Sequence, residues 1–232
     1  MDRLRILINS SPRSGHTWLQ YLLFNSLKNS NGVNLGATVD DFIVRTNVPV
    51  ILNATFKDIV QVSILRSPQD IIPSIVTKTM GGLGNNITSG IPMPHEMGSL
   101  PSLEKLVDDQ FGIYKLWSGT MLDNLDKVMA FTFDQATKDT EFVMSSIMKH
   151  FDIDYSIVLN ENIPSSIEHA RRKIMQHDKG EIGFNNPVPI DKKPDVYYKI
   201  KDIVDNHKLL NPTLNFYNDA CDLIKQSQLK WG

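Results

Sequence analysis

The segment Ser10–Gly15 joins a short apolar run to a stretch with helical periodicity, and its residue types suit the binding of an anion. A turn of this kind directs backbone N–H groups at the space above the helix start, where the helix dipole also favours negative charge. Gly15 allows close backbone approach to a ligand, and Arg13 adds a fixed positive charge. Ser14 and Thr17 add hydroxyl donors. The segment lacks the Gly-x-x-x-x-Gly-Lys-Ser/Thr pattern of nucleotide triphosphatases, and the alternative interpretation is an ordinary helix cap.

A second candidate anion site follows the apolar run Ile59–Leu65, which is typical of a buried strand. Arg66 ends this run, Pro68 suits the first turn of a helix, and Ser74 lies eight residues after the arginine. An arginine fork and a serine hydroxyl at this spacing can hold a phosphate dianion together. The alternative is an arginine that caps a neighbouring helix.

Both segments resemble motifs of the sulfotransferases that use 3′-phosphoadenosine 5′-phosphosulfate (PAPS). Pro12–Leu19 is similar to the family's 5′-phosphosulfate loop, with His16 in place of the usual threonine. Val62–Asp70, followed by Ser74, is similar to the 3′-phosphate motif. His177–Phe184 resembles, more weakly, the C-terminal loop that covers the nucleotide, or else it is a polar surface loop. The nucleotide site implied by the resemblance comprises Arg13, Ser14, Gly15, His16, Thr17, Trp18, Arg66, Ser74, Phe133, Lys179 and Gly180.

One position in this implied site and one beside it depart from the family pattern. Phe133 stands at the end of an expected strand, where the family has a tyrosine, so it lies near the adenine or is a core phenylalanine. Asp178, next to Lys179, stands where the family often has arginine, which predicts weaker binding of the phosphate at this loop.

The resemblance implies transfer of a sulfuryl group from PAPS to a hydroxyl or amine of a small-molecule or glycan acceptor, leaving 3′-phosphoadenosine 5′-phosphate (PAP). Negative charge then grows on the bridging oxygen, and Arg13 is the candidate that stabilises this charge. Its guanidinium stays protonated, so its role is electrostatic. No convincing metal-ligand spacing is present, since the six histidines are scattered and Cys221 is the single cysteine.

The general base for the acceptor is left open by the sequence. The family's Lys-Thr-His segment has its nearest match in Arg45–Asn47, which ends in asparagine. The candidates, in order of preference, are Asp41 or Asp40, then His95 or Glu96, and then His16.

Apolar runs that alternate with helical patterns predict a single α/β domain over residues 1–232, with a mostly parallel sheet between helices. The resemblance implies a three-layer α/β/α arrangement with P-loop-like topology. Residues 81–101 hold five glycines and three prolines, which predicts a lid, an acceptor loop or a disordered stretch. The expected strands are Leu4–Asn9, Phe42–Arg45, Val48–Leu52, Ile59–Leu65 and Val128–Phe133. The expected helices include one after Gly15, one after Pro68, Ser102–Asn124, Asp139–Phe151, a short helix with a Ser165–Glu168 capping box, Asp191–His207 and Asn215–Leu229.

Composition sets the remaining expectations. A net charge of −2 argues against a nucleic-acid or other polyanion partner, so an anion site must be a local cluster. The single cysteine indicates a reducing, cytoplasmic setting, and no apolar run approaches the roughly 20 residues that cross a bilayer. The rival interpretations are a P-loop kinase or nucleotidase and a non-catalytic nucleotide-binding relative. The oligomeric state is open.

Overall fold

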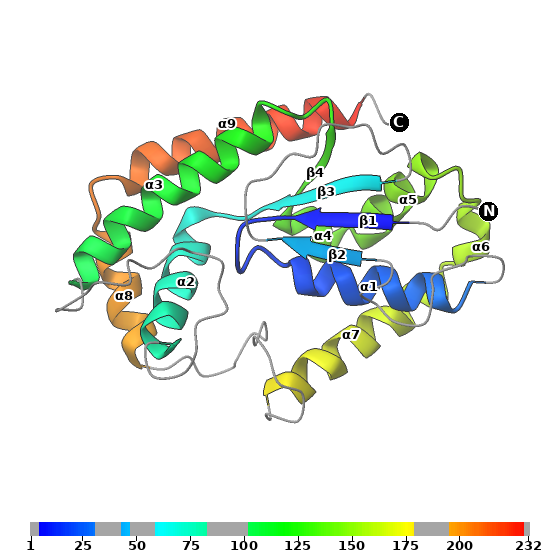
Figure 1. Cartoon of the computed structure of the whole chain (residues 1–232), viewed down its shortest axis with the longest axis horizontal. Coiled ribbons are helices and arrows are strands. Elements are labelled where there is room, and N and C mark those ends of the chain that lie inside the picture. Colours follow the sequence, from blue (N-terminus) through cyan, green and yellow to red (C-terminus); the bar gives the residue numbers. More distant parts are fainter. Residues whose placement is uncertain (1–4, 31–42, 47–58, 83–101, 179–194, 230–232) are drawn as a thin grey trace.

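The computed structural model describes residues 5–30, 43–46, 59–82, 102–178 and 195–229 (Figure 1). Within these ranges the chain is a mixed α/β structure around a parallel sheet with strand order β2-β1-β3-β4. The strands are β1 (Arg5–Asn9), β2 (Ile43–Thr46), β3 (Ile59–Leu65) and β4 (Val128–Thr132).

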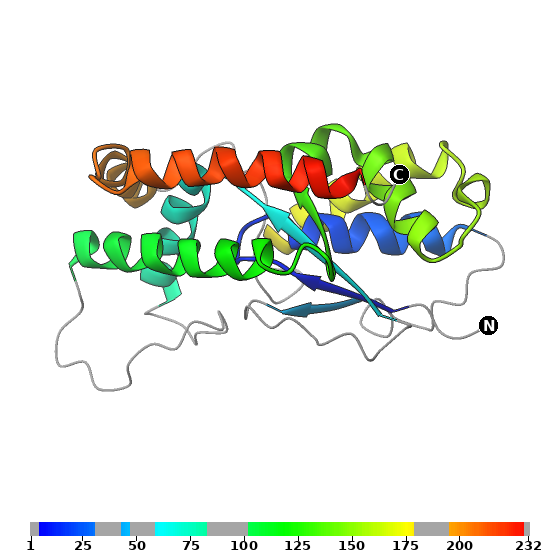
Figure 2. The ribbon, with the colours of Figure 1, turned by 90° about the horizontal axis from the view of Figure 1, so that it is seen from above.

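Helices make up most of the described chain, and two of them, α3 and α9, run alongside each other in both views (Figures 1 and 2). None of the described helices is long and apolar enough to cross a membrane. The helices are α1 (His16–Lys28), α2 (Pro68–Gly82), α3 (Leu103–Leu122), α4 (Phe133–Lys138), α5 (Thr140–His150), α6 (Tyr155–Val158), α7 (Asn162–Asp178), α8 (Asp195–Asp205) and α9 (Leu210–Gln228).

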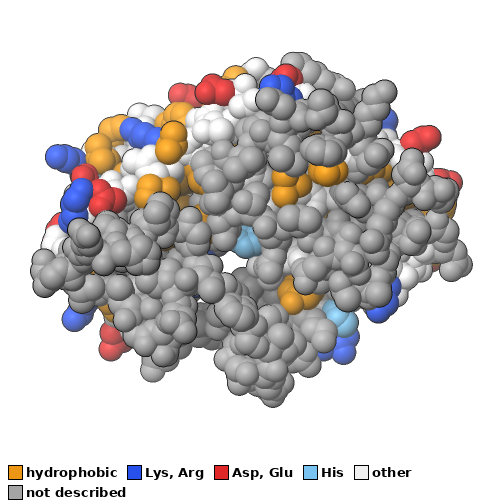
Figure 3. Space-filling view, in the orientation of Figure 1, with side chains coloured by type: hydrophobic (Ala, Val, Ile, Leu, Met, Phe, Trp, Pro, Cys, Tyr) orange, Lys and Arg blue, Asp and Glu red, His pale blue; other side chains and the backbone are white. Residues whose placement is uncertain are grey.

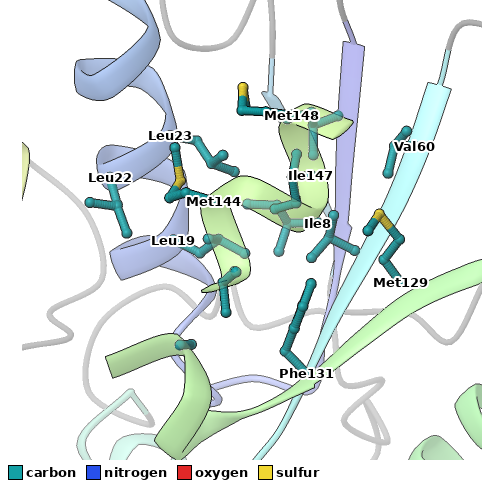
Figure 4. Packing of buried hydrophobic residues seen from close by; sticks show 14 of the residues in the cluster. Ile8, Leu19, Leu22, Leu23, Val60, Met129, Phe131, Met144, Ile147 and Met148 are labelled. Atoms are coloured by element: carbon teal, nitrogen blue, oxygen red, sulfur yellow. The ribbon is translucent and has the colours of Figure 1, made fainter. Parts of the chain in front are cut away.

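The core consists of two apolar clusters that share the sheet. Side chains alternate between the faces of a strand, so Met129 and Phe131 of β4 pack with α1 and α5 (Figure 4). Ala130, between them, packs in a second cluster with residues of α2, α3, α8 and α9. Helices therefore pack against both faces of β4.

The chain leaves β1 through α1 to reach β2 on one side, and it leaves β3 through α2 and α3 to reach β4 on the other side. The two connections diverge at the carboxyl ends of β1 and β3, which defines a topological switch point of the sheet. Ligands of open parallel α/β sheets bind at such points. The buried Ser10 hydroxyl, just past β1, accepts a 2.8 Å hydrogen bond from the Ile64 N–H and holds the two strand ends together.

Several expected elements are confirmed. β3 spans the predicted residues, α2 begins at Pro68, and Ser102 caps α3 by accepting a hydrogen bond from the Lys105 N–H. The second expected strand is present as β2. The candidate strand Val48–Leu52 lies outside the described residues, as do most of 81–101 and most of His177–Phe184.

Three local predictions are wrong. The Ser165–Glu168 pair does not cap a helix, because α7 already begins at Asn162 and places Ser165 inside it. α9 begins at Leu210, five residues before the expected start. In both cases a proline lies in the first helical turn, where its missing N–H costs no hydrogen bond. Phe133 begins α4 and is not the last residue of β4.

Candidate functional site

The turn after β1 adopts an unusual backbone that turns the chain sharply into α1. Arg13 has φ 68° and Gly15 has φ 100°, both in the left-handed region. The Ser14 N–H and hydroxyl both donate to the Ser11 carbonyl, at 3.2 and 2.6 Å, which closes the turn. Gly15 is the N-cap of α1 and has no side chain to cap its N–H groups. Such a turn at a helix N-terminus is the physical form of an anion-binding loop.

Gly15 is also the point where the turn meets α4. A Cβ at this position would lie 2.9 and 3.0 Å from two ring atoms of Phe133. Both the positive φ and this close approach require glycine. The Phe133 ring therefore packs directly against the turn.

A capping box fixes Phe133 at the start of α4. The Thr132 hydroxyl accepts from the Gln135 N–H at 3.2 Å, and the Gln135 side chain accepts from the Thr132 N–H at 2.9 Å. Gln228, the last residue of α9, donates to the Ala130 carbonyl at 2.8 Å and exchanges hydrogen bonds with Gln135. The end of α9 therefore supports the turn that presents Phe133.

We expect Thr132→Ala to lower the free energy of unfolding by about 1 kcal/mol, because the change removes an N-cap acceptor. Urea denaturation measures this change. Thr137→Ala is the matched control, since Thr137 is an exposed threonine within the same helix, where alanine is well tolerated. Equal stability of the two variants would contradict a role for the capping box.

Arg66 follows β3, and its guanidinium lies over the Phe133 ring. Its guanidinium carbon is 4.2 Å from the centroid of the Phe133 ring, and its Nη1 donates to the Arg13 carbonyl at 3.1 Å. The Tyr114 hydroxyl donates to the Arg66 carbonyl at 2.9 Å. Burial raises the pKa of Tyr114, which keeps this donor protonated.

The Nε of Arg66 is buried and has no hydrogen-bond partner within the described part of the chain. A buried donor on a charged group that lacks a partner is costly. An anion bound beside Arg66 would remove this cost.

Arg13 and Ser74 join the two sequence motifs. The Arg13 Nε donates to the Ser74 Oγ at 2.9 Å across 61 residues of sequence. The resemblance implies these groups at opposite ends of a nucleotide, and the structure places them in contact. A serine hydroxyl that accepts one hydrogen bond keeps its own O–H as a donor, so Ser74 can accept from Arg13 and still donate to an anion.

Lys78 lies close to Arg13 and was not among the residues expected from the sequence. It lies one helical turn after Ser74 on α2, and residues four apart share a helix face. Burial, together with the positive charge of Arg13, lowers the pKa of Lys78 to about 8. The signal in the sequence was the Ser74-to-Lys78 spacing, but its meaning depends on the position of Arg13.

The other expected site residues fall into two groups. Trp18 donates its Nε1–H to the Ala136 carbonyl at 3.2 Å and links α1 to α4, while Thr17 is buried and His16 is partly buried at the start of α1. The positions outside the described residues are Asp40, Asp41, His95, Glu96, Lys179 and Gly180.

Charge at the surface is mixed. On the face shown in Figure 3, the described Lys and Arg side chains are interspersed with Asp and Glu side chains. The described residues contain no group of three or more His, Cys, Asp or Glu side chains placed to hold a metal ion. Arg13, Arg66 and Lys78 bring three cationic side chains together near the switch point.

No protein-family model matches the chain, and a search of curated proteins finds no significant match. The functional assignment therefore depends on the residues themselves. Their arrangement could bind an anionic group at the carboxyl ends of β1 and β3.

Proposed function

We propose that this chain is a PAPS-dependent sulfotransferase with a three-layer α/β/α, P-loop-like fold. It transfers a sulfuryl group to a hydroxyl or amine of a small-molecule or glycan acceptor. The main support is the contact of Arg13 with Ser74, together with the hydrogen bond from Arg66 to the Arg13 carbonyl. These contacts bring the two motifs that resemble the phosphosulfate loop and the 3′-phosphate site to the switch point of one sheet.

The residues present fit this cofactor. PAPS carries an anionic group at each end of the nucleotide, and its bound form supplies an activated sulfuryl group. Arg66, whose buried Nε has no hydrogen-bond partner among the described residues, would hold the 3′-phosphate with the Ser74 hydroxyl. The turn from Pro12 to Gly15 would hold the phosphosulfate through its N–H groups.

Arg13 has the electrostatic role in this proposal. Its guanidinium lies at the phosphosulfate loop and stays protonated at all relevant pH values. Positive charge at this position stabilises the negative charge that develops on the leaving oxygen. The acceptor proton passes to a base, for which His16 is the candidate within the described residues. The candidates beyond them are Asp41, Asp40, His95 and Glu96.

The test is sulfuryl transfer from radiolabelled PAPS to a panel of phenols, amines and glycans. We expect turnover by the wild type and a loss of about 100-fold or more in Arg13→Asn, because removal of one preorganised charge or donor costs this much. Asparagine tolerates a positive φ, so this variant removes the charge and keeps the turn. Arg13→Lys, which keeps the charge, should retain more activity than Arg13→Asn.

Three outcomes would contradict the proposal. PAPS binding without turnover on any acceptor would favour the non-catalytic relative. Magnesium-dependent affinity for ATP would favour the kinase. Equal activity of Arg13→Asn and wild type would remove the assigned role of Arg13.

A further inference from the structure

Lys78 lies where a positive charge is unfavourable for the ligand-free protein. Lys78 is part of α2 and its side chain is half-buried. The positive charge of Arg13 lowers the pKa of Lys78 in addition to burial. Burial disfavours the charged form of lysine, and a like charge nearby lowers the pKa further. Residues held at a cost to stability are concentrated at functional sites.

The geometry connects Lys78 to the anion site already described. Ser74 and Lys78 are one turn apart on the same face of α2, and Ser74 accepts the 2.9 Å hydrogen bond from Arg13. Arg13 in turn accepts at its carbonyl from Arg66. The three cations therefore belong to one cluster, which spans the end of β1, the end of β3 and the second half of α2.

We propose that Lys78 is a third cationic binding group for the nucleotide, and that it contacts a phosphate anion held beside Arg13 and Ser74. This inference rests on the proposed function. It assigns a binding residue that neither motif contains. A flexible ammonium group suits this role, because it can follow the anion while the two arginines fix its position.

Two acidic groups on the described helices that pack against α2 have partners of their own, and a tyrosine there is half-buried. Asp205 of α8 accepts from Gln69 at 3.0 Å and from Lys201 of its own helix at 2.8 Å. Asp108 of α3 lies 3.8 Å from the His207 ring nitrogen. Tyr197 of α8 is half-buried, and its pKa is raised by burial and by Asp70. Arg13 is the charged group among the described residues that shifts the pKa of Lys78.

The affinity test uses calorimetric titration with PAP at pH 7. We expect Lys78→Met to bind about 10-fold more weakly than wild type, the lower range for a hydrogen bond to a charged group. Lys78→Arg should bind within about 3-fold of wild type, since charge is retained. Lys115→Met is the matched control, because Lys115 is an exposed lysine on α3, and it should leave affinity unchanged.

The end of the nucleotide that Lys78 contacts is identified with smaller probes. Titrations with adenosine 5′-monophosphate and adenosine 3′-monophosphate separate the two phosphates. A loss in Lys78→Met confined to one of these probes assigns Lys78 to that phosphate, and a loss with neither would overturn a direct contact.

Proton uptake on ligand binding distinguishes a lysine that contacts the anion from a lysine with a purely structural role. An anion beside Lys78 raises its pKa again, so binding near pH 8 should take up a fraction of a proton. Titrations in buffers of different ionisation enthalpy measure this uptake, and we expect it to be smaller in both Lys78→Met and Lys78→Arg.

Without nucleotide, the lowered pKa of Lys78 makes the stability of the folded protein depend on pH. The folded pKa of about 8 lies below the ordinary value of 10.5, so the unfolded chain binds more protons between these values. The contribution of Lys78 to stability therefore rises from pH 8 to pH 10.5. We expect Lys78→Met to have a higher melting temperature than wild type at pH 7.

The outcomes separate this inference from the proposed function. If wild type does not bind PAP, the proposed function fails. If wild type binds PAP and Lys78→Met binds it equally well, only the role of Lys78 fails. Equal losses in Lys78→Met and Lys115→Met would also overturn the inference, since a general field effect would then explain both.

Discussion

Replacing Arg66 with methionine is expected to weaken PAP binding by about 100-fold or more. A hydrogen bond to a charged group contributes about 1.5–3 kcal/mol, and an arginine fork makes two such bonds to a phosphate. Arg66 is held in place by the Phe133 ring and the Arg13 carbonyl, so little conformational freedom is lost on binding. Calorimetric titration measures the change.

Two further variants distinguish this effect from loss of folding. Arg66→Lys keeps the charge but cannot form the planar fork, so its affinity should lie between those of wild type and Arg66→Met. Arg172→Met removes an exposed arginine of α7 that pairs with Glu168, and it should bind PAP like wild type. If Arg66→Met binds PAP as tightly as Arg172→Met, Arg66 is not a phosphate ligand.

Gly15→Ala is expected to disrupt the turn that forms the other half of the site. The backbone at φ 100° is strained for alanine, and the new Cβ would lie 2.9 Å from the Phe133 ring. Strain of this kind costs about 1–3 kcal/mol. Because the same turn presents the N–H groups to the anion, we expect PAP affinity to fall by at least about 10-fold.

Gly112→Ala is the matched control for this prediction. A Cβ at Gly112 meets nothing within 4 Å, and the residue lies inside α3. Alanine is favoured over glycine by up to about 1 kcal/mol in a helix, so this variant should be as stable as wild type or more stable. Urea denaturation and PAP titration of both variants test the contrast, and equal behaviour would contradict the special role of Gly15.

Much of the sheet and the first part of the site were predictable from the sequence. β3 is covered on both faces, so it appears as a nearly continuous apolar run, and Pro68 marks the start of the next helix. The turn around Gly15 was recognisable because strand, turn and helix follow one another directly. Mixed α/β class and parallel pairing follow from this alternation.

The remaining features depend on contacts between distant segments. The starts of α7 and α9 were misjudged because a capping box was assigned to Ser165 and Glu168 and the last helix was placed from Asn215. Both helices begin earlier, and each has a proline in its first turn, which proline fits. The position of Phe133 depends on Gln135 and Gln228, which are 93 residues apart. The proposed role of Lys78 depends on its closeness to Arg13. The sequence pattern along one helix does not reveal this closeness.

A dedicated site for the 3′-phosphate would distinguish PAP from ADP and ATP in calorimetric titrations without metal. We expect micromolar or tighter binding of PAP, at least about 10-fold stronger than that of ADP, because ADP lacks the phosphate that Arg66 and Ser74 would hold. No binding of PAP, or equal binding of all three nucleotides, would show that the protein has no such site.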